Sequence, residues 1–244
     1  MKSAKGDKLD LSQRHLTSAP SEIWRNASLR VLNLFRNELT SLPASIAQLK
    51  ELRVLIVANN QLRALPEEIG TLRRLRMLDA GHNLIADLPR SFARLTSITD
   101  YLYLHDNRLE ILSDSIFENF LHLRYLNLSE NPLRELPASV GALVKLEELR
   151  LENIGLETLP GFLANLSALD ELALRNNRLA ALPDSFAKLR ELRHLDLRGN
   201  RFTQVPQVLN ALPKLHKLDL RWNDLGRLPA WLKELRACGC RVLL

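Results

Sequence analysis

The sequence predicts an α/β solenoid, in which small repeated units stack and each contributes one short strand and one short helix or 3-10 turn. Three observations lead to this fold class. Leucine makes up 57 of the 244 residues. Prolines recur every 23 residues from Pro20 to Pro89 and again from Pro137 to Pro229. Asparagines repeat at the same interval of 23 or 24 residues over most of the chain.

One unit shows how the elements follow from the residues. It starts with Leu-Arg-Val-Leu-Asn-Leu at 29–34 and continues through Asn37, Leu42-Pro43, Ile46 and Leu49. Alternation with period two predicts a short strand with two leucines facing inward. Apolar residues three apart after the proline predict a short helix or 3-10 turn with one buried stripe. A unit this small cannot bury its own leucines, so neighbouring units must share one core.

The same pattern predicts the strands in chain order. Ten are expected, at 9–11, 32–34, 55–57, 78–80, 102–104, 126–128, 149–151, 172–174, 195–197 and 218–220. An eleventh is expected at 242–244, because Cys238 and Val242 repeat the spacing of Ile98 and Leu102. Val242 and Leu244 should be its inward residues. A short helix or 3-10 turn should follow each Leu-Pro pair.

The unit pattern LxxLxLxxNxLxxLPxxIxxL resembles the leucine-rich repeat family, over about residues 9–244. The resemblance implies a curved, right-handed solenoid of about ten to eleven repeats, with a parallel sheet on its concave face and short helices or 3-10 turns on its convex face. The LPxxIxxL connector resembles the intracellular 23-residue subclass of Ras-suppressor-type, plant Ras-group and many bacterial repeat proteins. We therefore expect a polar lead-in at residues 1–8 and a single repeat domain at 9–244.

Asparagines at the corner after each strand are expected to form a structural ladder. A buried amide there can donate to and accept from the backbone of adjacent turns, which avoids the cost of unpaired polar groups. The expected asparagine ladder comprises Asn37, Asn60, Asn83, Asn107, Asn131, Asn177, Asn200 and Asn223. Arg14 and Ile154 stand at this position in the first and seventh units. At Ile154, either the ladder skips a rung or Asn153 takes the role.

The fourth and fifth units depart from the regular length. One extra residue precedes Leu102 and another precedes Leu123, and Ser113 replaces the usual proline. Phe117 and Phe120 then suggest a 24-residue variant with a phenylalanine-filled convex side. The departure is either accepted length variation or a local change of curvature that presents the neighbouring tyrosines.

Strand alternation also predicts which side chains cover the concave face. In units two to six these positions are apolar or aromatic, and a contiguous apolar surface usually marks an interaction site. Tyrosine and methionine are enriched at interfaces. The candidate partner-binding residues of this half are Phe35, Ile56, Met77, Tyr101, Tyr103 and Tyr125.

The last four units present a charged surface instead. Three arginines lie in one column beside Asp196 and Asp219, and a tryptophan closes that end. Mutual salt bridges with these aspartates are the alternative to a role in binding. The candidate partner-binding residues of this half are Arg175, Arg198, Arg221 and Trp222.

Composition and chemistry narrow the classes of function. The net charge of +6 raises nucleic acid as a partner, but no Lys/Arg run of five occurs, so nucleic acid is an unlikely partner. No apolar run reaches 18 residues, and the first residues contain no apolar leader segment, so neither a membrane span nor a signal peptide is expected. Cys238 and Cys240 suggest a reducing compartment and hence the cytoplasm.

No catalytic motif is present in the sequence. We find no glycine-rich phosphate loop, GxSxG or HExxH motif, and Cys238-Gly239-Cys240 lacks a second pair for zinc. We therefore expect no enzymatic activity, cofactor or bound metal. His82 and Asp106 should be neighbours, with His105 next in sequence. These three form either a metal or pH-sensitive cluster, or polar surface beside the tyrosines.

The sequence thus favours a non-enzymatic module that binds a protein or peptide on its concave face. By analogy with the Ras-suppressor subclass, the partner would be a signalling protein such as a small GTPase. The alternatives are a bacterial effector delivered into a host cytoplasm, the recognition domain of a longer enzyme, and a nucleic-acid binder. The open edge of the last strand leaves three outcomes: shielding by the segment around Trp231, end-to-end pairing of two copies, or truncation from a longer protein.

Overall fold

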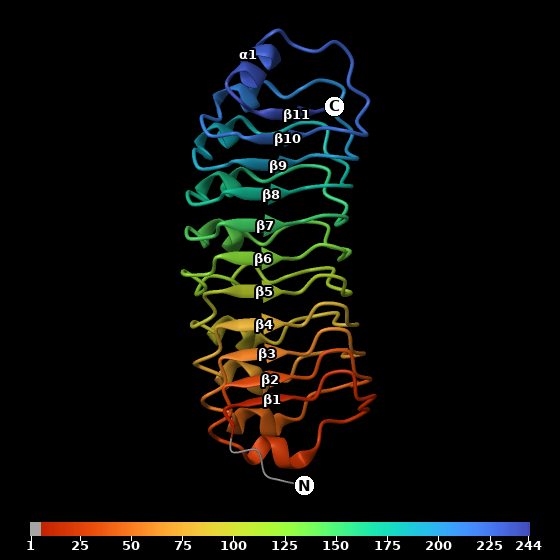
Figure 1. The fold of residues 1–244 in the computed structure, drawn as a ribbon, viewed down its shortest axis with the longest axis vertical. Helices are drawn as coiled ribbons and strands as arrows, with labels where there is room; N and C mark the ends of the chain where they lie inside the picture. Colours follow the sequence, from red (N-terminus) through yellow and green to blue (C-terminus); the bar gives the residue numbers. More distant parts are fainter. Residues whose placement is uncertain (1–5) are drawn as a thin grey trace.

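The computed structural model describes residues 6–244, and its eleven short strands form one parallel sheet in chain order (Figure 1). The strands are β1 (Lys8–Asp10), β2 (Val31–Asn33), β3 (Val54–Ile56), β4 (Met77–Asp79), β5 (Tyr101–Tyr103), β6 (Tyr125–Asn127), β7 (Glu148–Arg150), β8 (Glu171–Ala173), β9 (His194–Asp196), β10 (Lys217–Asp219) and β11 (Arg241–Leu243). The predicted leucine-rich repeat solenoid is confirmed. β1 begins at Lys8, which the expected lead-in included, and residues 1–5 of that lead-in lie outside the described part.

Short 3-10 helices follow the prolines on the other side of each turn. They are η1 (Ser21–Arg25), η2 (Ala44–Gln48), η3 (Glu67–Thr71), η4 (Arg90–Arg94), η5 (Ala138–Ala142), η6 (Gly161–Asn165), η7 (Asp184–Lys188) and η8 (Gln207–Ala211). Each begins directly after a proline, which stands at the N-cap; the Pro43 carbonyl, for example, accepts the Ile46 N–H at 3.0 Å. The one α-helix, α1 (Trp231–Ala237), lies in the last unit of the described chain.

The fifth unit differs as its sequence predicts. Ser113 replaces the proline, and residues 114–119 form turns instead of a 3-10 helix. Phe117 and Phe120 fill the interior there, and both are fully buried. The ring of Phe120 lies 5.7 Å from that of Phe92 in the preceding unit. Aromatic side chains therefore supply the packing that the missing helix would give.

One continuous core, mostly of leucine, runs along the solenoid and is closed at most corners by the asparagine ladder. Asn177 is typical. The Leu156 N–H donates to its Oδ1 (3.0 Å), and its Nδ2 donates to the carbonyls of Leu151 (2.8 Å) and Leu174 (2.9 Å). One amide thus pairs three backbone groups from adjacent turns. All eight predicted ladder asparagines make such bonds.

The ladder skips a rung at Ile154, which resolves the two alternatives. Ile154 is buried in the core, and Asn153 instead donates its amide to the exposed Glu130 carboxylate. The N–H of the buried Leu133, which would meet a ladder oxygen here, has no hydrogen-bond partner within residues 6–244. The turn adapts as well, because Gly155 adopts a left-handed φ of 79°. His15, which follows Arg14 in the other unit without a corner asparagine, does the same.

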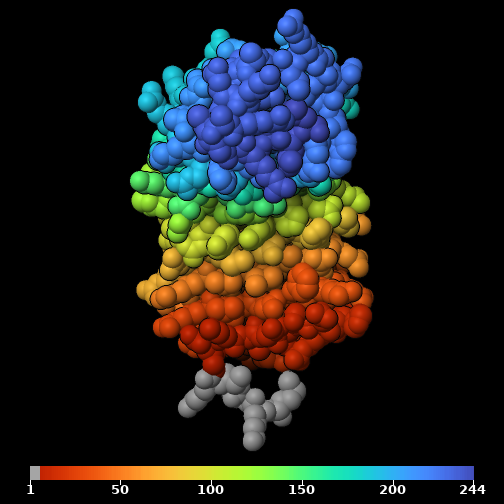
Figure 2. All heavy atoms as spheres, turned by 45° about the horizontal axis from the view of Figure 1, so that its top comes forward, coloured from red at the N-terminus to blue at the C-terminus, as the bar shows by residue number. Residues whose placement is uncertain are grey.

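The C-terminal end is partly shielded (Figure 2), where the last residues lie across the end of the stack. α1 buries Leu232 against η8, and β11 pairs with β10 so that Val242 stands beside Leu218. The inward position of Val242 agrees with the prediction. The prediction that the core also takes in Leu244 is wrong, since Leu244 is 42% exposed and does not pack against the core. Within the described chain, no further turn follows to cover it.

Replacing Asn177 by alanine should lower the free energy of unfolding by about 2 kcal/mol, because it leaves one buried N–H and two buried carbonyls without their partner. A denaturant titration measures this. Asn210→Ala is the control, since Asn210 lies exposed in η8 and should change stability by less than about 0.5 kcal/mol. Equal stability of the two variants would contradict a structural role for the ladder.

Candidate interaction site on the strand face

The strand face is the surface formed by side chains that point outward from the sheet. Parallel pairing without any register slip places equivalent residues of successive strands side by side. One column therefore runs through Val31, Val54, Met77, Tyr101 and Tyr125. The next column runs through Asn33, Ile56, Asp79, Tyr103 and Asn127. The register thus brings the predicted apolar and aromatic residues together.

Three tyrosines form the centre of this surface, which we call the tyrosine cluster: Tyr101, Tyr103 and Tyr125. Their ring centroids lie 4.8 Å apart for Tyr103 and Tyr125, 5.5 Å for Tyr101 and Tyr125, and 5.9 Å for Tyr101 and Tyr103. The rings of Tyr101 and Tyr103 are stacked, with 11° between their planes. Tyr101 is 45% exposed, and the other two are half-buried. The cluster is therefore an ordered aromatic surface that solvent can reach.

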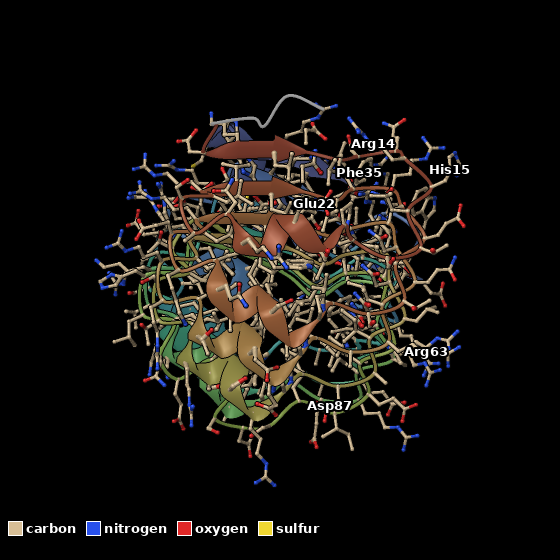
Figure 3. All side chains as sticks on the ribbon, turned by 90° about the horizontal axis from the view of Figure 1, so that it is seen from below. Arg14, His15, Glu22, Phe35, Arg63 and Asp87 are labelled. Carbon is tan, nitrogen blue, oxygen red and sulfur yellow. The ribbon has the colours of Figure 1, made fainter. Side chains whose placement is uncertain are left out.

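The other predicted apolar residues are less prominent. Phe35, Ile56 and Met77 are half-buried, so they form a low apolar floor beside the tyrosines. The N–H of Phe35 donates to Asn33 Oδ1 (2.9 Å), which fixes the backbone at the end of β2. Figure 3 shows Phe35, with Arg14 and His15, on the side where the strands end and the chain turns the corner.

Two histidines extend the ring system beyond the tyrosines. The His105 ring lies 6.0 Å from Tyr103 and 4.6 Å from His82. It sits directly over Gly81, where a Cβ would come within 2.3 Å of the imidazole, so a larger residue at 81 would require the His105 ring to rotate away. Burial, followed by the charge of His82, lowers the pKa of His105. His82 Nδ1 pairs with Asp106 Oδ2 at 2.5 Å.

A metal site at these histidines is not supported. Within residues 6–244, no group of three or more His, Cys, Asp or Glu side chains is arranged to hold a metal ion. His82, His105 and Asp106 lie beside the tyrosine cluster, and a pH-sensitive role for them stays a prediction. Cys238 and Cys240 are free thiols, exposed and buried respectively.

A carboxylate lies beside the tyrosines without a basic partner. Asp79 is adjacent to Tyr103 in the sheet, and its Oδ1 accepts the Gly81 N–H (3.1 Å). No Lys, Arg or His of the described residues forms an ion pair with it. Burial raises the pKa of Asp79, and the hydrogen bond from the Gly81 N–H and the charge of His82 partly oppose that rise. Burial also raises the pKa of Tyr103, and the charges of Asp79 and Glu148 add to that rise.

The arginine column of the charged half is held by its own carboxylates. Arg198 Nε bonds both oxygens of Asp196 at 2.9 Å, and Arg221 bonds Asp219 at 2.7 and 2.9 Å. Arg175 lies 3.5 Å from Glu152. Burial alone would raise the pKa of Asp219, but the hydrogen bonds and charge of Arg221 lower it overall. This arrangement agrees with the salt-bridge alternative, and partner binding by these arginines stays a prediction.

Trp222 ends the charged half at the corner position that is also left-handed in the preceding units, as at Asn176 and Gly199. Its φ of 61° is left-handed, which is costly for a bulky residue, and its side chain is 67% exposed. The guanidinium groups of Arg198 and Arg221 lie 5.7 and 5.5 Å from the ring centroid. The ring is therefore already engaged with two cations of the same molecule.

The strand face carries two shallow hollows. One, of about 240 Å³, lies beside Tyr101 and Tyr125 and is also lined by Glu148. The other, of about 210 Å³, lies over the small Ala173 between Arg150 and Asp196. The outward-facing positions read from the sequence did not predict either hollow. The small side chain of Ala173 was nevertheless a sign of the hollow that lies over it.

Two larger grooves lie away from the strand face, where the units are irregular. A groove of about 780 Å³ follows the missing rung and is lined by Leu133, Ile154 and Gly155. A groove of about 890 Å³ lies beside Ser113 and Ile111, in the unit without the proline. Both follow from departures that are visible in the sequence, but a groove at either place was not predicted.

Replacing Asp79 by asparagine should raise the free energy of unfolding at neutral pH by about 1 kcal/mol, because a half-buried charge without a cation is removed. The amide can still accept the Gly81 N–H, as Asn33 and Asn127 accept the equivalent N–H in the same column. The gain should shrink as the pH falls through the raised pKa of Asp79, above its ordinary 3.8, since protonated Asp79 is also neutral.

Denaturant titrations at two pH values measure the effect. Asn33→Asp is the matched reverse change, because it places a carboxylate at the equivalent position of β2, and it should lower stability. If Asp79→Asn lowered stability at neutral pH, the charge of Asp79 would have to be stabilised by an interaction that is not among the ion pairs of the structure.

Comparison with known proteins identifies the repeat. A family model described as leucine rich repeat matches residues 7–62, 50–109, 99–156 and 167–225. A leucine-rich repeat protein of Leptospira interrogans is 32% identical, with a TM-score of 0.90 over 97% of this chain and 60% of that one. No curated protein sequence gave a significant match. No helix within residues 6–244 has the length and apolar character needed to span a bilayer.

Two receptor structures are also similar. A TDR receptor is 29% identical, with a TM-score of 0.80 over 92% of this chain and 40% of that one. The plant peptide hormone receptor RGFR1 in complex with RGF2 is 26% identical, with a TM-score of 0.66 over 93% of this chain and 45% of that one. The chain therefore spans 60% or less of the length of these solved proteins.

Proposed function

Because this chain belongs to the leucine-rich repeat family, we propose that it is a non-enzymatic binding module whose strand face holds a protein or peptide through the tyrosine cluster. The single observation that carries the proposal is the set of three mutually contacting, solvent-accessible tyrosine rings on adjacent strands. Tyrosine supplies large contact area at a low cost in conformational entropy, which is why it is frequent among residues that dominate binding energy.

The dimensions of the strand face support this function. Eleven strands spaced about 4.8 Å apart give a sheet about 50 Å long. A standard interface needs about 800 Å² from each partner, which a face of this length can supply. The columns are held by continuous pairing along the sheet. Binding would therefore require little reorganisation of the backbone.

The similarity to a receptor solved with a peptide hormone supports a peptide or protein as the class of partner. The tyrosines, with their half-buried apolar floor, are the better candidates for the contact surface. The arginines at 175, 198 and 221 are paired internally and would have to exchange those partners for a ligand. A cytoplasmic signalling role with a small GTPase as partner is a further hypothesis, by analogy alone.

A selection from a library of displayed random peptides tests the proposal. The intact protein is the target, and each enriched peptide is then measured against the double variant Tyr101→Ala/Tyr103→Ala. We expect peptides that bind the intact protein and lose affinity for the double variant. If every enriched peptide binds both proteins equally, or if none is enriched, the tyrosine cluster is not the binding surface for peptides.

A further inference from the structure

The tyrosine rings are free of cations, in contrast to the other exposed aromatic side chain of the strand face. Among residues 6–244, the contacts between a cation and a ring are those of Arg198 and Arg221 with Trp222. The nearest arginine in the next strands, Arg150, is turned toward carboxylates, with Nε 2.6 Å from Glu148 and an Nη 3.6 Å from Glu171. No cation–ring contact therefore forms at the tyrosines within the described residues, and Tyr101, at 45% exposed, is the ring that a ligand can reach most readily.

Carboxylates flank the rings on both sides. Asp79 is the sheet neighbour of Tyr103 on one side, and Glu148 is the sheet neighbour of Tyr125 on the other. Asp79 has no basic partner in the described chain, and its only hydrogen bond there comes from the Gly81 N–H. Glu148 and Glu171 share one arginine. Arg124 and Arg150 also lie beside the tyrosines. Both are ion-paired, Arg124 with Glu147 and Arg150 with Glu148 and Glu171, which leaves Asp79 as a carboxylate without an ion pair among residues 6–244.

We propose that the tyrosine cluster, with Asp79 and Glu148, accepts a basic side chain of the partner, preferably arginine. This inference rests on the proposed function and specifies the chemistry of the ligand. A cation over an aromatic face is attracted by the ring quadrupole, and a nearby unpaired carboxylate strengthens that attraction. A planar guanidinium group can also stack on a ring while it donates hydrogen bonds to a carboxylate, which an ammonium group cannot do.

The unpaired charge of Asp79 favours the binding of a cation at this site. A half-buried carboxylate without a partner costs folding energy, and an asparagine would make the same backbone hydrogen bond. Strand alternation and packing do not require a charge at this position, since Asn33, Ile56 and Asn127 occupy it in neighbouring units. An incoming guanidinium group would pair with the charge that the fold leaves uncompensated.

Two small-molecule probes test the inference directly. N-acetyl-arginine amide carries the guanidinium group, and N-acetyl-citrulline amide has nearly the same shape without the charge. The chain contains three tyrosines, all in the cluster, so a sample labelled with ¹³C in tyrosine reports on this site alone. We expect saturable shifts of the ring signals with the arginine probe and binding at least about fivefold weaker with the citrulline probe.

Variants separate a specific site from general attraction. Asp79→Asn should weaken the arginine probe at least about fivefold, although the variant folds at least as stably as the parent protein. Asp87→Asn is the matched control, because it removes one exposed carboxylate from the loop of the same unit while keeping an acceptor for the Leu88 N–H. It should leave the affinity unchanged. Equal binding of the two probes, no saturable shift, or equal losses in both variants would overturn the inference.

The inference and the proposed function can fail separately. Peptides that require the tyrosines but contain no Lys or Arg would overturn the inference and leave the proposed function standing. Arginine binding at the cluster, with no peptide that depends on the tyrosines, would support the cation site and contradict the proposed function.

Discussion

Replacing Gly70 by alanine is expected to lower the free energy of unfolding by about 3 kcal/mol. In an ordinary helical position alanine would be the better residue, because glycine loses more backbone entropy on folding. At Gly70, however, a Cβ would lie 2.3 Å from the Ser91 carbonyl oxygen and 2.6 Å from the Ser91 Cβ. η3 and η4 approach each other closely here, and a Ser91 hydroxyl bond to the Glu67 carbonyl (2.5 Å) ties them together. Relief of the clash would require two turns of backbone to separate.

Gly141→Ala is the matched control. Gly141 occupies the same place in η5, but a Cβ there would lie 3.1 Å from both the Cβ and the carbonyl oxygen of Phe162, so a backbone shift of a few tenths of an ångström relieves the contact. Its stability should change by less than about 1 kcal/mol. Denaturant titration of both variants measures the difference. If Gly70→Ala were as stable as the parent protein, η3 and η4 would not lie as close together as described here.

Removing two tyrosines of the cluster is expected to have the largest effect on binding. For a peptide selected on the intact protein, Tyr101→Ala/Tyr103→Ala should raise Kd at least about 30-fold, which corresponds to about 2 kcal/mol. The two stacked rings would be lost from the centre of the surface, and Tyr125 would lose both of its aromatic neighbours. Calorimetry or fluorescence anisotropy measures the change.

Two exposed apolar residues outside the strand face provide the control. Ile111 is 72% exposed and Leu121 is 50% exposed, so Ile111→Ala/Leu121→Ala removes apolar surface of a similar kind elsewhere. It should change Kd by less than about threefold. The unfolding midpoint of the tyrosine variant must show that it is still folded, so that a loss of affinity is not caused by unfolding. Equal losses of affinity in the two double variants would show that the peptides bind apolar surface without preference for the cluster.

The fold could be predicted from the sequence because one rule repeats. A unit with two inward leucines and a corner asparagine has a single way to bury both, and the neighbouring unit must supply the other half of the packing. The prediction of a buried residue failed at Leu244. The described chain contains no further unit there, so no neighbouring leucines cover this side chain. At Ile154 the sequence showed that a rung was altered, but the choice between a gap and a substitute depended on where the Asn153 amide turns.

The candidate site could be predicted only in part. Period-two alternation placed Tyr101, Tyr103 and Tyr125 on one surface, and parallel register brought their rings together. The sequence placed the arginine column beside Asp196 and Asp219 and so suggested salt bridges, which side-chain geometry shows. Alternation does not reveal which charges stay unpaired, so the isolation of Asp79 emerged only from side-chain geometry. The placement of His105 over Gly81 likewise depends on a rotamer that no sequence pattern specifies.

The most direct test of the central claim is a titration of the tyrosine-labelled protein with a peptide that it selects. Since the chain has three tyrosines and all belong to the cluster, every ring signal reports on the proposed contact surface. Our account predicts that the ring signals shift and saturate with the same Kd that calorimetry gives for the peptide. A peptide that binds by calorimetry while the tyrosine ring signals stay unchanged would contradict it.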